Sequence, residues 1–384
     1  MKKIVIIGGG AAGYFTAINA KESNPDLDVT ILEKGKEVLQ KVKISGGGRC
    51  NVTHACFEPK ELVKFYPRGE KELLGPFHQF MTGDTFEWFD DRGVPLKIEG
   101  DNRVFPEANT SQAIIDCFQK SVDTLGIKVL TNHGVNTVTK QDDTWSIHTK
   151  EQVFEADQLV IAAGSSKKVW ELCETLDHAV VAPVPSLFTF NINDKRLVDL
   201  LGTSVPNATV TISGTKLEAS GPLLITHWGM SGPAVLKLSA FGARILADKH
   251  YQYNVEVNWL SRPTDKVLNV LLNLKKKEPR KTVILKSPFT EVSRRLWERF
   301  VLFSDISKTQ NWADLNNAQL EKLANQLTKG IYNANGRTTF KEEFVTAGGV
   351  DLKEINFKRF ESRKHNNLFF VGEVLNIDAV TGGF

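Results

Sequence analysis

Three glycines and one carboxylate near the start of the chain have the spacing of a dinucleotide-binding site. Gly8, Gly10 and Gly13 form a Gly-x-Gly-x-x-Gly pattern, and Glu33 follows about 20 residues later. In such a pattern the glycines allow a tight turn, a close approach of pyrophosphate to the backbone, and close packing of a helix on a strand. The phosphates then lie at the positive end of the helix, and the acid accepts hydrogen bonds from ribose hydroxyls.

A second glycine-rich loop follows at residues 45–51, with the sequence Ser-Gly-Gly-Gly-Arg-Cys-Asn. Three consecutive glycines let the backbone pass close to a flat ligand, and Arg49 and Asn51 add charge and hydrogen bonds. A nicotinamide dehydrogenase would continue into another βα repeat here, so the loop favours FAD. A flexible surface turn is the alternative interpretation. Cys50 lacks a partner at CxxC spacing, so we expect it to pack beside the flavin and not to reduce disulfides.

The hydrophobic pattern predicts the strands and the helix that position the glycine motif and Glu33. The apolar run 4–7 is typical of a parallel strand buried on both faces, and a helix pattern follows the glycines. Residues 28–32 form a second strand that ends at Glu33. Strand, glycines, helix, strand and acid in this order are far more specific than the glycine pattern alone. The alternative is a structural glycine turn in an unrelated α/β protein.

The composition is typical of a globular protein and limits the kinds of partner that we expect. The 384 residues are 41% hydrophobic and 24% charged, with a net charge of +3, which argues for neither a nucleic-acid nor a membrane partner. No apolar run approaches the roughly 18–20 residues that span a bilayer. The four cysteines show no CxxC pair and no metal-ligand spacing with histidine, so we expect reduced thiols, no metal site and a cytoplasmic location. The basic strip 275–281 is interpreted as a solvated connection between helices.

Four motifs together resemble one protein family, the HI0933-like (BaiN/YhiN) flavoproteins. They are the 45–51 loop, the Thr-His-Trp-Gly-Met-Ser-Gly-Pro segment 226–233, the Thr-Ala-Gly-Gly-Val segment within 345–350, and Gly-Glu-Val-Leu 372–375 followed by Thr-Gly-Gly 381–383. The resemblance runs from residue 4 to residue 384. It implies an FAD-dependent oxidoreductase whose FAD domain is similar to glutathione-reductase-type and fumarate-reductase-type flavoproteins.

The expected fold is α/β, with a Rossmann-like FAD-binding domain of glutathione-reductase type and an inserted substrate domain. We expect the FAD domain at 1–185 and 341–384. The insert then occupies 186–340, with a β part at about 186–260 and a helical part at about 262–330. Residues 134–155 read as a β-meander, and 159–164 read as a buried strand that ends in small residues.

The residues expected to bind FAD combine the two glycine-rich loops with positions that the resemblance implies. In similar flavoproteins the residue at Val135 offers its backbone to the adenine, and the small end of the 159–164 strand lies against the dinucleotide. The amides of 381–383 would stabilise negative charge on reduced flavin. The full set is Gly8, Gly10, Ala11, Ala12, Gly13, Glu33, Lys34, Ser45, Gly46, Gly47, Gly48, Arg49, Cys50, Asn51, Val135, Ala163, Gly164, Gly372, Glu373, Thr381, Gly382 and Gly383.

The function expected from these residues is hydride transfer between flavin N5 and an organic small molecule. His227 is the candidate proton donor or acceptor, and the alternative is that it only orders its turn. No second Gly-x-Gly-x-x-Gly is present, so NAD(P)H is expected to act as a transient reductant. A flavin-dependent tRNA-modifying enzyme is a second hypothesis.

Departures from the family pattern motivate a third hypothesis, a degraded FAD-binding protein. The family usually has Asp at Asn376 and Gly at Ala379, and it continues into a helix where this sequence stops at Phe384. The first change removes a charge, and the second is expected to restrict the backbone near the flavin. A missing helix would remove its dipole.

Overall fold

The computed structural model describes residues 1–338, 345–380 and 383. It divides into two compact units, which are described separately. Unit 1 comprises Met1–Val184 and Val345–Phe384, and unit 2 comprises Pro185–Phe344.

A seven-stranded sheet forms the centre of unit 1, in the order β19-β20-β21-β10-β1-β2-β6. Five neighbouring strands are parallel: β21 (Leu368–Phe370), β10 (Gln158–Ile161), β1 (Lys3–Ile7), β2 (Asp28–Leu32) and β6 (Lys128–Leu130). The short strands β19 (Ile355–Asn356) and β20 (Glu361–Ser362) extend this sheet with antiparallel pairing. Residues 4–7 are buried, as expected for a strand covered on both faces.

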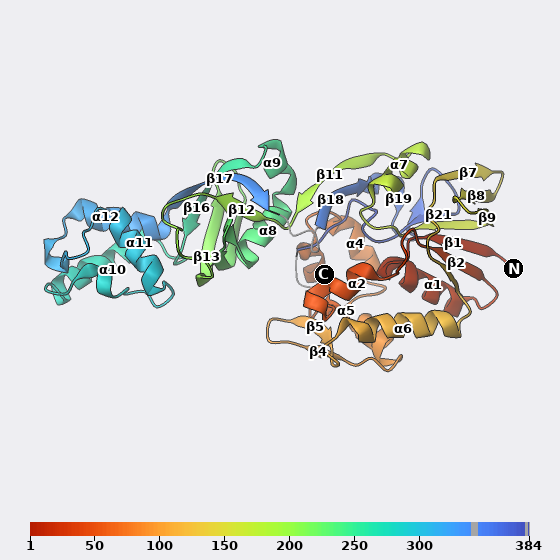
Figure 1. The fold of residues 1–384 in the computed structure, drawn as a ribbon, viewed down its shortest axis with the longest axis horizontal. Coiled ribbons are helices and arrows are strands. Elements are labelled where there is room, and N and C mark those ends of the chain that lie inside the picture. Colours follow the sequence, from red (N-terminus) through yellow and green to blue (C-terminus); the bar gives the residue numbers. More distant parts are fainter. Residues whose placement is uncertain (339–344, 381–382, 384) are drawn as a thin grey trace. The chain divides into compact units, whose positions relative to one another are not determined.

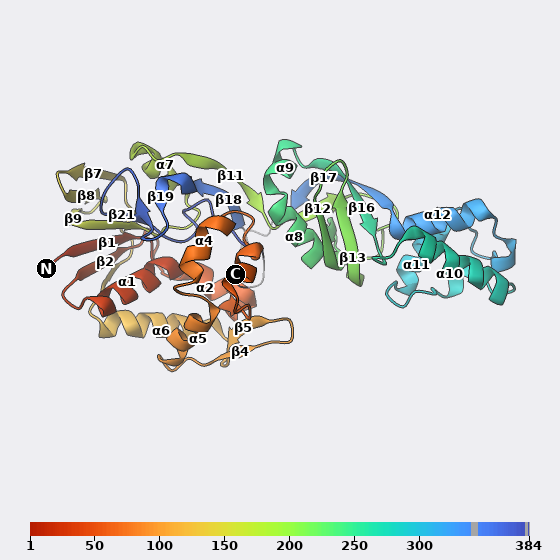
Figure 2. The ribbon, with the colours of Figure 1, turned by 180° about the vertical axis from the view of Figure 1, so that it is seen from behind.

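Helices cover one face of this sheet, and a small second sheet lies over the other (Figure 1, Figure 2). On the first face, α1 (Ala11–Ser23) and α6 (Ser111–Thr124) pack their apolar sides into one core cluster. On the second face lie α7 (Lys167–Thr175) and the predicted meander of β7 (Thr137–Gln141), β8 (Thr144–His148) and β9 (Val153–Ala156).

The remaining elements of unit 1 lie between β2 and α6 or next to unit 2 in the sequence. The helices are α2 (Gln40–Gly48), α3 (Pro59–Leu62), α4 (Glu70–Phe77) and α5 (Thr82–Asp90). The strands β3 (Thr53–His54), β5 (Arg103–Pro106) and β4 (Leu96–Ile98) form a three-stranded sheet. A two-stranded sheet pairs β11 (Val180–Ser186) with β18 (Val345–Val350). The chain therefore leaves and re-enters unit 1 through paired strands.

Unit 2 is built on a closed six-stranded barrel in the order β12-β15-β14-β13-β16-β17. These strands are β12 (Thr189–Ile192), β15 (Gly229–Ser231), β14 (Glu218–Ile225), β13 (Ser204–Ile212), β16 (Gln252–Asn258) and β17 (Gly330–Thr338). Two helices, α8 (Pro233–Phe241) and α9 (Ala243–Asp248), follow β15 in the sequence. Along β16, Tyr253, Val255 and Val257 are buried, whereas the residues between them are more exposed. This alternation is what a barrel with a packed interior requires.

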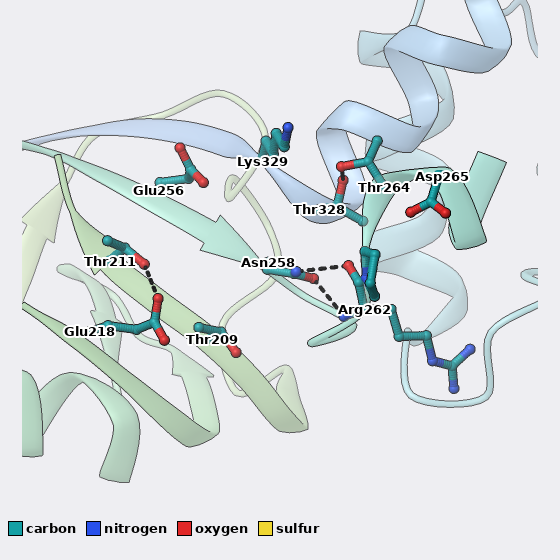
Figure 3. A pocket seen from close by; sticks show the side chains of 11 residues that line it. Thr209, Thr211, Glu218, Glu256, Asn258, Arg262, Thr264, Asp265, Thr328 and Lys329 are labelled. Carbon is teal, nitrogen blue, oxygen red and sulfur yellow. Dashed lines mark hydrogen bonds between the residues drawn. The ribbon is translucent and has the colours of Figure 1, made fainter.

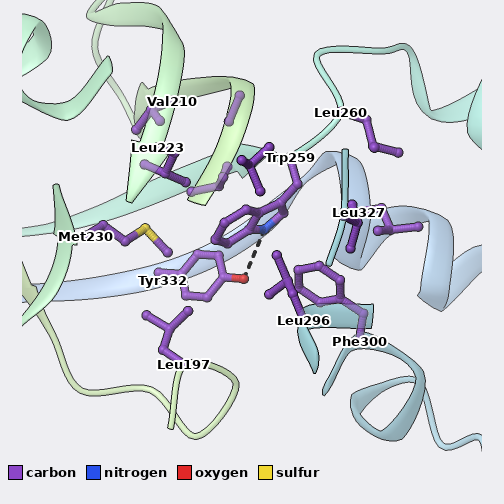
Figure 4. Packing of buried hydrophobic residues seen from close by; sticks show 14 of the residues in the cluster. Leu197, Val210, Leu223, Met230, Trp259, Leu260, Leu296, Phe300, Leu327 and Tyr332 are labelled. Carbon is purple, nitrogen blue, oxygen red and sulfur yellow. Dashed lines mark hydrogen bonds between the residues drawn. The ribbon is translucent and has the colours of Figure 1, made fainter. Parts of the chain in front are cut away.

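A helical part is inserted between the last two barrel strands. It contains α10 (Thr264–Lys277), α11 (Arg294–Phe303) and α12 (Asn317–Thr328). Trp259 at the exit of β16 packs against Phe300 of α11, and its indole N–H donates to the hydroxyl of Tyr332 on β17 at 3.2 Å (Figure 4). The prediction of a β part followed by a helical part missed this return, because 330–338 completes the barrel after the helices.

The predicted fold class is confirmed: an α/β Rossmann-type unit combines with an inserted unit of strands and helices. Among residues 1–338, 345–380 and 383, no helix is both long and apolar enough to cross a lipid bilayer.

Candidate functional site

The first glycine motif forms the turn between β1 and α1, and each glycine meets different surroundings. Gly8 has a φ of +120°, and a Cβ there would overlap the backbone of Ala162 and Ala163. A Cβ on Gly13 would overlap the carbonyl oxygen of Gly8, so this glycine permits the close packing of helix and strand. A Cβ on Gly10 would meet no described atom within 4 Å. The backbone at Gly10 thus borders open space.

The N-terminus of α1 has the properties of an anion site. Gly10 is its N-cap, no side chain caps the helix, and its first turn contains no acidic residue. Helices present free N–H groups and a partial positive charge at this end. The predicted contact of a phosphate with the backbone of Ala11 and Ala12 agrees with these properties and stays a prediction.

The predicted adenosine end lies where β2 meets the loop after β6. Glu33 Oε2 accepts from the amide of Gly9 at 2.9 Å, and Oε1 accepts from the amide of Gly35 at 2.7 Å. These bonds fix the carboxylate beside the glycine turn, and each oxygen retains a lone pair for a ribose hydroxyl. Lys34 is exposed, whereas Val135 is buried in the cluster that includes Ile7 and Leu32.

The second glycine loop interrupts α2 and bends the chain back on itself. Gly46 and Gly47 both have positive φ, and the amide of Cys50 donates to the carbonyl of Ser45 at 2.9 Å. A Cβ on Gly47 would meet no described atom within 4 Å, and a Cβ on Gly48 would only reach a carbonyl at 4.0 Å. The backbone is therefore open at Gly47 and Gly48, and its contact with a flat ring stays a prediction.

The side chains of this loop point in different directions. The guanidinium of Arg49 bonds Glu99 at 2.7 Å and Asn109 at 3.2 Å, and it lies 3.9 Å from the ring centre of Phe105. Its charge is therefore matched inside unit 1, a partnership that no sequence pattern signalled. Asn51 accepts from the amide of Val104 at 3.3 Å. A flavin-facing role for Arg49 stays a prediction.

Two distant segments meet the glycine turn. Gly372 has a φ of +75°, and a Cβ there would stand 2.8 Å from the Cβ of Ala12. Gly164, which follows Ala163 after β10, lies near the carboxylate of Glu373. Lys41 bonds that carboxylate at 2.9 Å and the hydroxyl of Ser165 at 3.3 Å. Sequence reasoning missed Lys41, because one lysine in a helix carries no signal of its partner.

The segment after Glu373 is held from several sides. Trp170 donates its indole N–H to the carbonyl of Val374 at 2.9 Å, and Asp378, whose carboxylate is buried, forms an ion pair with Arg68. The buried Oδ1 of Asn376 has no hydrogen-bond partner among the residues described. Ala379 does not adopt a positive φ, so its Cβ imposes no strain of the kind expected from the missing glycine.

The C-terminal motif approaches the second glycine loop. A Cβ on Gly383 would overlap Oδ1 of Asn51, so these two predicted site residues are neighbours. Thr381 and Gly382 lie outside the described residues.

These features fit the diphosphate and ring system of FAD. The uncapped helix end suits the phosphates, and the open backbone at Gly10 and Gly47 leaves room for a ligand. The unpartnered amide oxygen of Asn376 offers an acceptor to a bound group.

His227 belongs to unit 2, in the turn between β14 and β15. Backbone hydrogen bonds hold this turn: the amide of Thr226 donates to the carbonyl of Gly229 at 2.8 Å, and the carbonyl of Trp228 accepts from the amide of Ile192 at 2.9 Å. His227 is exposed and contacts the edge of the half-exposed Trp228, with ring centres 5.3 Å apart. Its role in proton transfer stays a prediction.

A polar hollow of about 550 Å³ also lies in unit 2, between the outer face of the barrel and the start of α10 (Figure 3). Glu218 bonds Thr211 across neighbouring strands at 3.3 Å, and Asn258 Nδ2 donates to the carbonyl of Arg262 at 2.9 Å. The polar side chains of Glu218, Thr211 and Asn258 thus have hydrogen-bond partners within the hollow. None of its lining residues was predicted to bind FAD.

Comparison with known proteins agrees with the motifs. A family model described as "HI0933-like protein Rossmann domain" matches residues 2–384. A ribosomal RNA dihydrouridine synthase of Haemophilus influenzae is 26% identical over 394 residues, covering 99% of this chain and 94% of that protein. A 3-dehydro-bile acid delta(4,6)-reductase of Clostridium scindens is 25% identical over 402 residues, covering 100% and 95%.

Among solved structures, 3-ketosteroid-delta4-(5alpha)-dehydrogenase from Rhodococcus jostii RHA1 is 12% identical, with a TM-score of 0.49, and the match covers 100% of this chain and 92% of that one. The family assignment does not depend on this likeness. Because the family model spans nearly the whole sequence, the prediction from the motifs is confirmed, and the chain belongs to the HI0933-like family of FAD-dependent oxidoreductases.

Proposed function

We propose that this protein saturates a carbon–carbon double bond conjugated to a carbonyl group in an organic substrate. The observation that supports FAD binding, and with it this proposal, is the uncapped N-terminus of α1 together with the open backbone at Gly10 and Gly47. FAD supplies hydride transfer at N5 when it is bound. The substrate class rests on the full-length relatives: dihydrouridine is uridine with a saturated ring double bond, and the bile-acid enzyme is named for reducing double bonds.

The residues of this chain have separate tasks in the proposal. The amides of 11–13 hold the pyrophosphate, and Glu33 holds the adenosine ribose. Gly46, Gly47 and Gly48 let the backbone approach the ring system. His227 exchanges the proton that accompanies hydride transfer. The free thiols of the four cysteines suit a reducing compartment, so we place the reaction in the cytoplasm.

NAD(P)H is the proposed electron donor, visiting the flavin transiently. The experiment is anaerobic mixing of the purified holoprotein with NADH or NADPH, followed by loss of oxidised-flavin absorbance. We expect bleaching by at least one donor and recovery of the spectrum when a conjugated enone is added. A flavin that neither donor reduces would contradict the proposal and favour a degraded FAD-binding protein.

The role of His227 is tested separately by His227→Asn, with Trp228→Phe as a neighbouring control that keeps an aromatic ring. We expect His227→Asn to bleach normally with the donor but to slow reoxidation by the enone at least tenfold. Turnover equal to that of the unmodified protein with FAD bound would remove His227 from the mechanism.

A specific observation supports RNA as a second candidate substrate. Residues 262–330 contain 14 Lys and Arg against 7 Asp and Glu, although the whole chain carries an excess of only three positive charges. Such asymmetry is typical of polyanion binding, and a full-length relative is named for ribosomal RNA. Retention of structured RNA on the protein, weakening steeply between about 50 and 200 mM salt, would support this substrate. No retention at low salt would exclude it.

A further inference from the structure

A hollow of about 640 Å³ lies in unit 1, and none of the predicted FAD residues lines it. One wall is α4 and the turn after it, including Lys71, Pro76 and Gln79. The other wall is formed by residues of the segment 352–363, which contains the hairpin of β19 and β20. The volume is in the range typical of pockets for small organic ligands.

The charge of this hollow is strongly positive. Its lining contains the cations Lys71, Lys353, Lys358 and Arg363 and the single carboxylate Glu72. None of these four cations takes part in a salt bridge recorded within the described ranges. The guanidinium Nε of Arg363 donates to the carbonyl of Ile355 at 3.2 Å.

Two acids that neighbour the lining, Glu354 and Glu361, are engaged by other residues. Glu354 bonds Lys364 at 2.8 Å and His178 at 2.9 Å, and Glu361 faces Arg359 at 3.3 Å. These two carboxylates are therefore already paired with cations other than the four that line the hollow. Cations gathered with few acids repel one another, and a bound anion relieves that repulsion.

Part of the lining is apolar and aromatic. Phe357 is half-buried and holds its position by an edge-on contact with Phe360, with ring centres 5.5 Å apart. Pro76 and Leu352 add aliphatic surface, while Gln79 and Asn356 contribute amide groups. A flat ring with polar edges, joined to a phosphate, matches this combination of surfaces.

Both walls are tied to the segment that follows Glu373. Lys71 comes three residues after Arg68, the ion-pair partner of Asp378. Leu352 comes two residues after Val350, whose amide donates to the carbonyl of Val374 at 3.0 Å. A ligand that orders the walls would therefore also order residues 374–378.

We propose that this hollow binds the phosphorylated adenosine part of NADPH, with the 2′-phosphate among the four cations and the adenine against Phe357. The inference rests on the proposed function for the identity of the ligand as a reductant, and it adds a preference for NADPH over NADH. A phosphate monoester carries a charge of about −1.5 to −2 at neutral pH, which suits a lining of four cations and one acid.

The test is calorimetric titration of the holoprotein with 2′,5′-ADP and with 5′-AMP. Wild-type protein should bind 2′,5′-ADP at least tenfold more tightly than 5′-AMP. Lys353→Glu and Lys358→Glu should each weaken 2′,5′-ADP binding about tenfold or more, because each removes one charge-assisted contact and adds repulsion. Phe357→Ser should weaken both nucleotides. Lys120→Glu and Lys150→Glu, exposed lysines of unit 1 outside the hollow, change the net charge equally and should leave both affinities unchanged.

Equal affinity for the two nucleotides, or equal weakening by the control substitutions, would overturn the proposal. So would a loss of RNA retention in Lys353→Glu and Lys358→Glu without any 2′,5′-ADP binding, since the hollow would then serve a polynucleotide. Calorimetry does not depend on turnover, so these outcomes are distinct from failure of the proposed reaction. Flavin reduction that persists equally with NADPH and NADH would overturn the preference while leaving the reaction intact.

Discussion

At the scale of single residues, the glycines of one motif differ in what they do. Gly8 and Gly13 are required by the protein itself, because a Cβ at either position would overlap backbone atoms. Gly10 is not, because a Cβ there would point into open space. The sequence pattern predicted a tight turn at Gly8, an approach of pyrophosphate at Gly10 and helix–strand packing at Gly13. The surroundings of the three glycines are compatible with these roles, and the ligand contact at Gly10 stays a prediction.

Gly10→Ala and Gly13→Ala should therefore fail in different ways. Gly13→Ala should destabilise the fold by about 1–3 kcal/mol, as expected for overpacking. Gly10→Ala should unfold at the same temperature as the wild type when FAD is absent, yet bind FAD at least tenfold more weakly. Thermal unfolding of the apoprotein and FAD titration measure the two effects. Equal FAD affinity in Gly10→Ala would show that the ligand does not pass this backbone.

Cysteine reactivity provides a second prediction at this scale. Burial raises the pKa of the Cys50 thiol and raises the pKa of the Cys173 thiol to about 12, and Cys117 is raised for the same reason. Thiolates, not thiols, react with alkylating agents. Iodoacetamide at pH 7.5 should label the partly exposed Cys56 first, as read by peptide mass spectrometry. Early labelling of Cys50 would contradict its buried position.

The ion-pair partners of charged side chains could not be predicted from the sequence. Arg49 was predicted to serve the flavin, but its guanidinium contacts Glu99, 50 residues later. Lys41 was not predicted, although it bonds Glu373. Such pairs depend on tertiary proximity, which hydrophobic periodicity and motif spacing do not encode.

At the scale of elements, His178 joins three segments of unit 1. Its ring lies in the turn between α7 and β11, and Nδ1 bonds Glu354 at 2.9 Å, just before β19. Nε2 bonds the hydroxyl of Ser362 on β20 at 3.0 Å. Ser362 also accepts the amides of Lys364 and His365, so the cluster is a saturated structural network.

This network predicts a pH dependence of stability. Burial lowers the pKa of His178 below its ordinary value of 6.5, although Glu354 acts in the opposite direction. The unfolded chain therefore takes up the proton first as pH falls. Stability contributed by neutral His178 should be present above about pH 6.5 and be lost as pH falls from there towards the folded-state pKa. Thermal unfolding from pH 7.5 to 5.5 should show a steeper loss in wild type than in His178→Gln, and parallel curves would contradict this account.

The strands also show where local patterns suffice and where they fail. The buried runs 4–7 and 159–161 were predicted because parallel central strands are apolar throughout. The barrel strand β17 was not predicted, because its sequence Gly-Ile-Tyr-Asn-Ala-Asn-Gly-Arg-Thr is mostly small and polar. Hydrogen bonding to β12 and β16 on either side stabilises this segment as a strand, although its residues have a low intrinsic propensity for β structure.

At the scale of the whole molecule, the two units have separate hydrophobic cores. The large cluster of unit 2 includes Trp259, Trp297 and Tyr332, and the two clusters of unit 1 flank its central sheet. Separate cores allow separate unfolding transitions. All predicted FAD residues belong to unit 1, whereas His227 belongs to unit 2.

Calorimetry of the protein with FAD removed should therefore resolve two transitions. FAD at about 100 times its dissociation constant should stabilise one of them by about 2.7 kcal/mol and leave the other in place. Trp259→Phe, which removes the donor to Tyr332, should lower only the transition that FAD does not move. A single transition that shifts as a whole would show that the units unfold together.

The paired strands β11 and β18 give this architecture an order of assembly on the ribosome. Unit 2 is completely synthesised once residue 344 has emerged, whereas β21 and Gly372, which contacts Ala12, are made later. Domains fold as units during synthesis, so the inserted unit can close before the unit that contains the first residue. If FAD binding at the turn between β1 and α1 requires Gly372, which lies against Ala12, we expect FAD to bind only after residue 372 has been synthesised.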